Sequence, residues 1–265
     1  MKKATLLYSM LFVFIFTNQS CKKDSTLKNQ VVSQTASSQS EDDAVVIDSS
    51  LLCYLPFNSN LRDKSGHNNN GSLVGTVSYV SDRFGNASKA VSFSASNSYI
   101  EIPETQFVGL KTMTIAMDFY PTTSNQQVLM SKMSYSEPFD SPDFYQSFIV
   151  DLQANGIIAF DIRQNGFCNA LGTGWNPNLY SSSSVIYNAW NHLAITFNNT
   201  VQRVYLNGNL VGIGTKTSSP ICHGEPIRLA VWWQTDPEYF TGNMDEVRIY
   251  KRVLSSNEIK KLSTR

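Results

Sequence analysis

The length, composition and charge of the chain limit the functions open to it. It has 265 residues, with 21 Lys and Arg against 21 Asp and Glu, so its formal net charge is +0 at pH 7. Nucleic-acid binding needs a basic face, and the main part of the sequence contains no basic block, so we expect no nucleic-acid partner.

The first twenty residues have the features of an export signal. Two lysines open the chain and precede an apolar run over residues 4–16, which is too short for a membrane-spanning helix of ~20 residues. A short polar stretch then leads directly into Cys21. Residues 1–20 resemble a bacterial lipoprotein signal, and this resemblance implies that Cys21 is the lipidated first residue of the mature chain. The alternative is an ordinary secretory signal that is cleaved nearby.

Residues 21–47 are expected to form a flexible tether. They are rich in Ser, Gln, Asp, Lys and Thr, with few aliphatic residues and no aromatic ones. Such a segment cannot bury enough apolar surface to offset the entropy lost on ordering. An exported chain with a lipid anchor and this tether would display its domain at the outer membrane or cell surface, and the lipid would be its only contact with the membrane.

Residues 48–265 are predicted to form one all-β domain. Short runs of β-branched and aromatic residues are separated by turn sequences, and helical periodicity is almost absent before residue 255. The candidate strands, in chain order, are Leu51–Phe57, Ala90–Phe93, Tyr99–Ile102, Met113–Tyr120, Gln127–Met133, Tyr145–Leu152, Ile157–Arg163, Trp190–Phe197, Arg203–Leu206, Asn209–Gly212, Pro226–Trp233 and Phe240–Tyr250. Hairpin signals at Asn155-Gly156 and Asn207-Gly208 favour a two-sheet antiparallel sandwich.

The last candidate strand is followed by a short helix. Its alternating pattern predicts that Asp245 and Glu246 point to opposite faces. The sequence Ser255-Ser-Asn-Glu258 is a capping box, which predicts a helix with Ile259 and Leu262 on one side.

The faces of the strand at 190–197 can also be predicted. Trp190 and His192 should face one side, and Leu193 and Ile195 the other. We expect Trp190 and His192 to have packing roles, since a lone His on a patterned strand is usually structural.

Five segments, taken in order, indicate a known family. They are Leu55–Gly71, Phe84–Phe93 with Ser98–Pro103, Met113–Pro121, Trp190–Phe197 with Val204–Gly212, and Gly242–Ser255. Together they resemble laminin-G-like, concanavalin A-like jelly-roll domains, and the resemblance covers nearly everything from residue 51 to residue 262. It implies a concanavalin A-like jelly roll closed by a short C-terminal helix.

The resemblance also implies a bound calcium ion. Members of the family often bind calcium with an Asp from the first loop and an Asp from the closing strand, which here are Asp63 and Asp245. Asp63 stands in a Gly- and Asn-rich loop whose carbonyls suit a hard cation. The alternative is that Asp63 caps its turn and that Asp245 accepts backbone hydrogen bonds.

Aromatic residues in and near two long loops are the candidate ligand-binding residues. Residues 134–144 and 165–184 are too long and too aromatic for plain turns. Sugar rings stack on exposed aromatic faces, while amides and carboxylates bond their hydroxyls. The rings predicted to bind are Tyr145, Trp175, Tyr180, Trp232 and Trp233; for each of them packing is the alternative. Because Trp232 and Trp233 are adjacent on a predicted strand, only one of them can be a platform.

Three cysteines remain once Cys21 is set aside. An odd number in an oxidising compartment leaves one thiol without a partner in the chain. Cys53 lies in a strand-like run and, if buried and free, would behave as a small hydrophobe. Cys168 and Cys222 lie in Gly- and Pro-rich loop sequence, and we predict a disulfide between them.

These patterns predict non-catalytic recognition of a polysaccharide or other glycan at the cell surface. A module for adhesion or assembly within a surface protein complex is the alternative, and a divergent glycoside hydrolase is a weaker one. Glucanases of this fold resemble one another in a strand motif Glu-x-Asp-x-x-Glu, which places the carboxylates on one strand face. The sequence has no such triplet, so we assign no catalytic residue.

Overall fold

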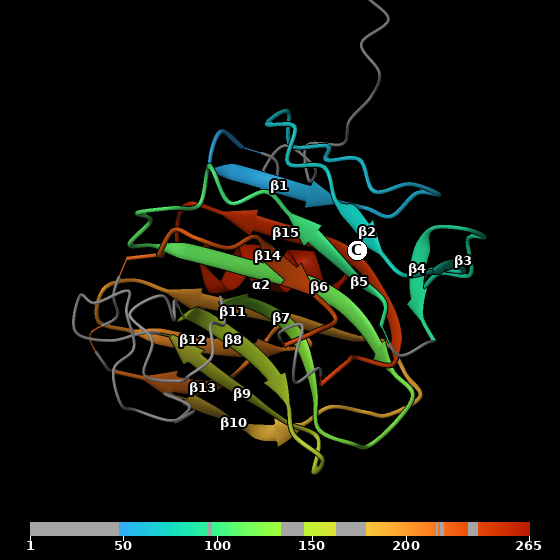
Figure 1. Ribbon diagram of the computed structural model, residues 1–265. Helices are drawn as coiled ribbons and strands as arrows, with labels where there is room; N and C mark the ends of the chain where they lie inside the picture. The colour runs from blue at the N-terminus through green and yellow to red at the C-terminus, as the bar shows by residue number, and fades with distance from the viewer. Residues whose placement is uncertain are drawn as a thin grey trace, which may run out of the picture. The chain divides into compact units, whose positions relative to one another are not determined.

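Two antiparallel β-sheets packed face to face make up the domain (Figure 1). The computed structural model describes residues 48–94, 97–133, 146–162, 179–215, 217, 220–232 and 238–265. The architecture is the all-β jelly-roll sandwich that the sequence predicts. Within the described part of the chain, no helix has the length and hydropathy needed to cross a membrane.

One sheet, called sheet A here, contains the first and last strands of the domain. Its strands run in the order β13-β12-β11-β6-β15-β4-β3, and β1 also pairs with β15. Their bounds are β1 Leu51–Leu55, β3 Ser78–Val80, β4 Ala90–Phe93, β6 Met113–Pro121, β11 Asn191–Phe197, β12 Gln202–Leu206, β13 Asn209–Gly214 and β15 Gly242–Tyr250. The two ends of the domain therefore lie side by side in one sheet.

The other sheet, sheet B, runs in the order β10-β9-β8-β7-β14-β5-β2. Its strands are β2 Ser72–Val74, β5 Tyr99–Ile102, β7 Gln127–Met133, β8 Gln146–Leu152, β9 Ile157–Ile162, β10 Leu179–Ser184 and β14 Ile227–Leu229. In both sheets, strands distant in sequence are neighbours: β6 lies between β11 and β15, and β14 lies between β7 and β5. Such crossings between sheets are typical of jelly rolls.

The inner faces of the sheets form the hydrophobic core. Ile115 of β6 and Ile195 of β11 are fully buried there, together with Phe160 of β9. The rings of Phe160 and Phe197 stack across the interface with their centroids 5.9 Å apart. Each such side chain contributes about 1.5–3 kcal/mol relative to an exposed one, so this core holds the sheets in fixed register and positions their outer faces.

Helix α2 (Ser256–Ser263) covers part of the outer face of sheet A. Its two buried residues, Ile259 and Leu262, pack on outer-face residues of β6 and β11. The predicted capping box is present: Ser255 Oγ accepts the N–H of Glu258 at 3.3 Å, and the Glu258 carboxylate accepts the N–H of Ser255 at 2.7 Å. The predicted helix is therefore confirmed, including its cap.

The alternation of β15 is interrupted by a β-bulge. The register of β15 against β6 shifts between Asp245 and Arg248, and Glu246 has a φ of 55°, as an extra residue in a strand requires. Val247 joins the core after the bulge, as Met244 does before it, and Glu246 lines the same pocket as Asp245. The prediction that Asp245 and Glu246 point to opposite faces is therefore wrong.

Some strands of sheet B differ from the sequence-based expectation. β14 ends at Leu229, because Ala230 has a φ of 71° and leaves the extended conformation. Trp232 therefore lies beyond the strand, and the argument that it and Trp233 alternate across a strand no longer applies. β10 occupies the end of a predicted loop, since its four serines give little strand propensity.

Candidate functional site

Two of the five rings predicted to bind ligand lie in the described part of the chain. Tyr180 stands on β10 with 51% of its surface exposed. Trp232 is half-buried, and its carbonyl accepts the Ser131 hydroxyl at 2.7 Å. Tyr145, Trp175 and Trp233 lie outside the described residues, so their roles stay predictions.

Tyr180 belongs to a row of residues that crosses the outer face of sheet B. In strand register, Tyr180 pairs with Ala159, Ala159 with Asp151, and Asp151 with Val128. Adjacent strands lie about 4.8 Å apart, so Tyr180 and Asp151 stand roughly 10 Å apart with only the small Ala159 between them. The row therefore places a carboxylate two strands away from an exposed aromatic ring.

Asp151 is the polar centre of this row and is 2% exposed. Its Oδ2 accepts hydrogen bonds from the side-chain amides of Gln153 at 2.6 Å and Gln126 at 3.1 Å. Its Oδ1 is buried and has no hydrogen-bond partner among the described residues. Burial, and then the negative charge of Glu238, raise the pKa of Asp151 to about 7. A buried carboxyl oxygen without a hydrogen bond makes the folded state less stable.

An aromatic platform beside a carboxyl group and two amides suits a polyhydroxylated ligand. The ring offers its apolar face to one side of a sugar, and the polar groups can bond hydroxyls. Sequence reasoning identified Tyr180 but missed Asp151, Gln126 and Gln153. The available signal was the single acid in β8, Gln146–Leu152, with a glutamine two residues after that acid.

The two predicted calcium ligands, Asp63 and Asp245, accept hydrogen bonds from the chain. Asp63 accepts four hydrogen bonds, from the N–H groups of Tyr54, Ser65 and Asn69 and from the Ser65 hydroxyl, all at 2.7–2.8 Å. Asp245 accepts the N–H of Glu246. These are the bonds of the alternative interpretation, and the described residues include no group of three or more Asp, Glu, His or Cys able to hold a metal. Calcium binding stays a prediction that requires this loop to rearrange.

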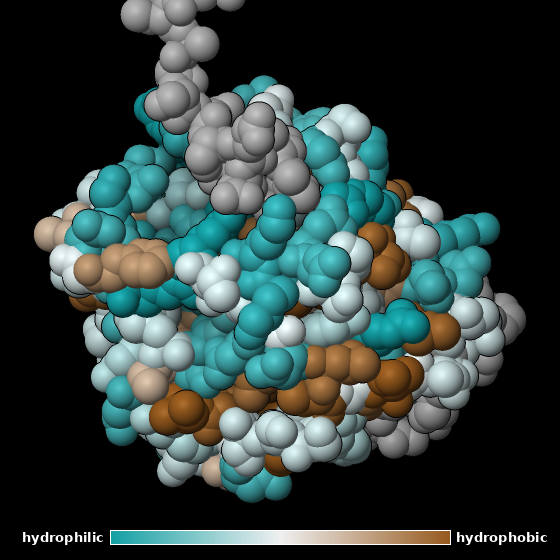
Figure 2. Space-filling model, turned by 180° about the vertical axis from the view of Figure 1, so that it is seen from behind, coloured by the Kyte–Doolittle hydropathy of each residue, from teal (hydrophilic) through white to brown (hydrophobic). Residues whose placement is uncertain are grey.

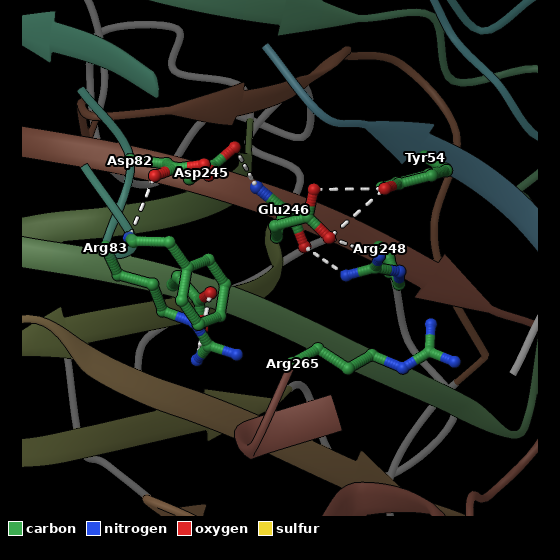
Figure 3. Close-up of a pocket in the computed structure, with 9 residues that line it drawn as sticks. Tyr54, Asp82, Arg83, Asp245, Glu246, Arg248 and Arg265 are labelled. Atoms are coloured by element: carbon green, nitrogen blue, oxygen red, sulfur yellow. Dashed lines mark hydrogen bonds and ion pairs between the residues drawn. The ribbon is translucent and has the colours of Figure 1, made fainter. Parts of the chain in front are cut away.

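Asp245 instead lines a pocket of about 250 Å³ on the outer side of sheet A (Figure 3). The pocket is lined by Tyr54, Asp82, Arg83, Phe84, Asp118, Asp245, Glu246, Arg248 and Arg265. Three parts of the fold supply them: the paired strands β1, β6 and β15, the turn between β3 and β4, and the C-terminus. The β15 bulge places two consecutive acids in this one pocket.

Two of the four acids in the pocket are paired with basic side chains. Asp118 binds Arg83 at 3.2 Å and His192 Nδ1 at 2.6 Å, and Glu246 binds Arg248 and the Tyr54 hydroxyl. His192 thus lies on the face of β11 opposite Leu193 and Ile195, as predicted, and its ring bonds Asp118.

Asp245 has no ion pair with the described residues. It lies opposite Asp118 in the β15–β6 register and is 4% exposed. Burial, and then the neighbouring charge of Glu246, raise the pKa of Asp245 to about 8.

Two of the three candidate cysteines lie in the described part of the chain. Cys53 is free and buried in β1, as predicted, and burial raises the pKa of its thiol well above the ordinary value. Cys222 is also buried. Cys168 lies outside the described residues, so the Cys168–Cys222 disulfide stays a prediction.

A comparison of the sequence with models of protein families identifies the fold. A sequence model described as the concanavalin A-like lectin/glucanases superfamily matches residues 94–260, which is more than half of the chain. The chain belongs to this superfamily. The match of the superfamily begins after β4, and the pairing of β1 and β4 with β15 includes these earlier strands in the same sandwich. Comparison with curated proteins gave no significant match.

Solved structures of the same fold come from secreted enzymes and toxins. Domain 4 of AbnA, a GH43 extracellular arabinanase from Geobacillus stearothermophilus solved with arabinotriose, is 21% identical with a TM-score of 0.59, over 80% of this chain and 98% of that domain. The binding domain of botulinum neurotoxin DC, in complex with SialylT, is 15% identical with a TM-score of 0.59. That of Paraclostridial mosquitocidal protein 1 is 19% identical with a TM-score of 0.61. Both matches cover 82% of this chain but only 52% of the toxin binding domain. At these identities the likeness to the solved structures shows the fold alone.

Proposed function

We propose that this chain is a non-catalytic glycan-recognition domain that binds its ligand on the outer face of sheet B, between Tyr180 and Asp151. The observation that carries the proposal is the row in which an exposed ring stands two strands from a buried carboxyl group with an uncommitted oxygen. A sugar ring stacked on Tyr180 would extend toward Asp151, and a hydroxyl could bond its Oδ1. Because Oδ1 is buried, this bond requires the residues that cover it to move aside. The complexes of structural neighbours with arabinotriose and SialylT support a sugar as ligand.

Surface display is the second part of the proposal. The signal-like residues 1–20, the lipidation site at Cys21 and the tether over residues 21–47 would place the domain outside the cell on a lipid anchor. Replacing the thiol in Cys21→Ala should move the protein from the membrane fraction to the soluble exported fraction of a bacterial host. Retention of the variant in the membrane fraction would contradict the lipid anchor.

A glycan array probed with the purified chain carrying Cys21→Ala tests ligand binding. We expect binding to at least one glycan, weakened about tenfold by Tyr180→Ala, since an aromatic contact contributes ~0.5–1.5 kcal/mol beyond its buried area. Asp151→Asn should weaken it by a similar factor or more, because a hydrogen bond to a charged group contributes ~1.5–3 kcal/mol. The matched control is Phe84→Ala, which removes a ring that is 64% exposed in the pocket of sheet A. Equal losses in all three variants would contradict the proposed site.

The same array, probed with and without a calcium chelator, tests whether the chain binds calcium. A fall in binding or in melting temperature would support Asp63 and Asp245 as ligands after rearrangement of their loop. No change in either measurement would remove calcium from the proposal.

A protein partner is the alternative that a silent array would favour. The face of the domain seen in Figure 2 is mostly hydrophilic but carries a band of hydrophobic residues. Leu210 and Ile213, on the sheet-edge strand β13, are 47% and 55% exposed. A surface of this kind suits contact with another protein. Adhesion would survive Tyr180→Ala and be weakened by Ile213→Ser.

A further inference from the structure

A single side-chain amide joins two carboxyl groups on the outer face of sheet B. The Nε2 atom of Gln126 donates to Asp151 Oδ2 and to Glu238 Oε2, at 3.1 Å in each case. Because both oxygens bond one nitrogen, they lie within roughly 6 Å of each other. Glu238 is only half-buried, so its carboxylate stands near the surface beside the buried Asp151.

The backbone holds Glu238 in this place. The N–H of Val128 donates to the carbonyl oxygen of Glu238 at 3.0 Å, and Val128 forms a parallel bridge with Tyr239. Val128 is also the residue of β7 that pairs with Asp151. The segment that carries Glu238 therefore runs beside β7, and the position of its carboxylate next to Asp151 is built into the fold.

The described residues around Asp151 include acidic groups but no basic one. The other side chains next to Asp151 are amides and apolar groups, namely Gln126, Gln153, Val128 and Ala159. No described lysine or arginine forms an ion pair with Asp151. Burial, and then the negative charge of Glu238, raise the pKa of Asp151. A ligand that bonds Asp151 would enter the same negative field.

On the basis of the proposed function, we infer that the carboxylate of Glu238 makes the glycan site selective for uncharged sugars over sugars that carry a carboxylate, such as uronic acids. A sugar carboxylate that reached Asp151 from Tyr180 would lie within roughly 10 Å of Glu238, which is about the Debye length at 0.1 M salt. Salt would therefore screen the repulsion only in part. A hydroxyl group in the same position would not be repelled.

A site for acidic sugars would need a basic group that is available to the ligand. Arginine is the usual partner of a carboxylate, which it binds through two parallel hydrogen bonds. Arg228 lies on the same face of sheet B, two strands from β8. Its guanidinium group already binds Glu101 at 3.0 Å and Glu225 at 2.5 Å, so its charge is balanced within the chain.

The selectivity should increase with pH, because Asp151 itself gains a charge. The groups that face Asp151 from the neighbouring elements are Gln126, Val128, Ala159, Gln153 and Glu238, and Asp161 lies on the same face two residues after Ala159. The pKa of Asp151 is about 7, so this group is neutral at pH 5 and ionised at pH 8. Uronic acids, with a pKa of about 3.5, are charged at both. We therefore expect the ratio of neutral to acidic affinity to rise at least about threefold from pH 5 to pH 8 in the parent chain.

A glycan array that pairs neutral oligosaccharides with their uronic acid counterparts, such as galactotriose with trigalacturonic acid, tests the inference. It is probed with the chain carrying Cys21→Ala. At pH 8 the acidic member of each bound pair should bind at least about tenfold more weakly than the neutral member. Glu238→Gln removes the charge but keeps an acceptor for Gln126, and should reduce this difference to about threefold or less. The matched control is Glu225→Gln, which removes a carboxylate that is paired with Arg228 and should keep the parent difference.

The outcomes separate the selectivity from the proposed function. Acidic sugars that bind as tightly as neutral ones, in a site still weakened by Tyr180→Ala, would overturn the selectivity and leave the glycan site in place. An array that is silent for both classes would contradict both. Equal losses for both classes in Glu238→Gln would assign Glu238 to direct contact with the sugar and overturn the selectivity. If Glu238→Gln does not fold, the pH series on the parent chain decides, and a ratio that does not rise with pH overturns the inference.

Discussion

Asp151 and Asp245 are buried carboxyl groups on the outer faces of opposite sheets, and among the described residues Asp151 Oδ1 has no hydrogen-bond partner. Burial raises the pKa of both groups, to about 7 for Asp151 and about 8 for Asp245. A raised pKa means that the folded protein holds the proton more tightly than the unfolded chain does. Each group therefore makes the fold less stable once the pH is high enough to ionise it.

The pH dependence of stability should show this effect for Asp151. The unfolded carboxyl has a pKa of about 3.9, so its stabilising contribution is complete below about pH 4 and is lost as the pH rises through about 7. We expect Asp151→Asn to match the parent at pH 4 and to be more stable by about 1–3 kcal/mol at pH 8. Chemical denaturation at both pH values measures this. In Tyr180→Ala the free energy of unfolding should change between pH 4 and pH 8 as it does in the parent. The same change in Asp151→Asn would contradict the raised pKa of Asp151.

At the residue scale, the role of a single side chain can be predicted from the sequence when its chemistry is unusual among the residues around it. Tyr180 was identified because it stands in a sequence that is too long and too aromatic for a plain turn, and the turn-capping alternative for Asp63 describes its hydrogen bonds. Asp151 was missed because one acid in a strand has no pattern of its own. Its role depends on Ala159 and Tyr180, which become its neighbours only through strand pairing.

At the scale of elements, the closing helix is set by local sequence and should respond to local changes. Ser255 caps α2 and bonds the N–H of Glu258. We expect Ser255→Ala to lower the free energy of unfolding by about 1 kcal/mol. Ser256→Ala, one residue later and equally exposed, should change it little. Equal effects of the two substitutions in thermal or chemical denaturation would show that the cap adds nothing.

The sequence patterns predicted which segments form most of the strands. They did not predict every position at which the inward–outward alternation within a strand shifts. The alternation in residues 240–250 locates β15, yet the bulge at Glu246 comes from how β15 meets β6, and neither strand alone encodes it. For the same reason the pocket could not be predicted, because the bulge is what brings Asp245 and Glu246 together. β10 was missed because serines carry no apolar period, although pairing with β9 makes them a strand.

At the scale of the molecule, we expect the sandwich to require β15, because this strand pairs with three others. It contacts β1, β4 and β6. A chain that stops at residue 241 loses all three pairings and should show no cooperative thermal transition. A chain that stops at Leu254 loses only α2, and should keep the sandwich with stability lowered by about 3–6 kcal/mol from the exposed Ile259 and Leu262 sites. Circular dichroism on both chains measures this. A cooperative transition in the shorter chain would contradict the central role of β15.

The side-by-side placement of β1 and β15 has a consequence for the export that we propose. A chain that crosses a membrane from its N-terminus delivers Leu51–Leu55 first, while the partner strand Gly242–Tyr250 arrives nearly two hundred residues later. Until then β1 has no neighbour in sheet A, and contacts between such distant segments form slowly. We expect the domain to stay unfolded throughout its passage. Because its first and last strands pair with each other, the exported chain would stay unfolded until its last strand has crossed the membrane.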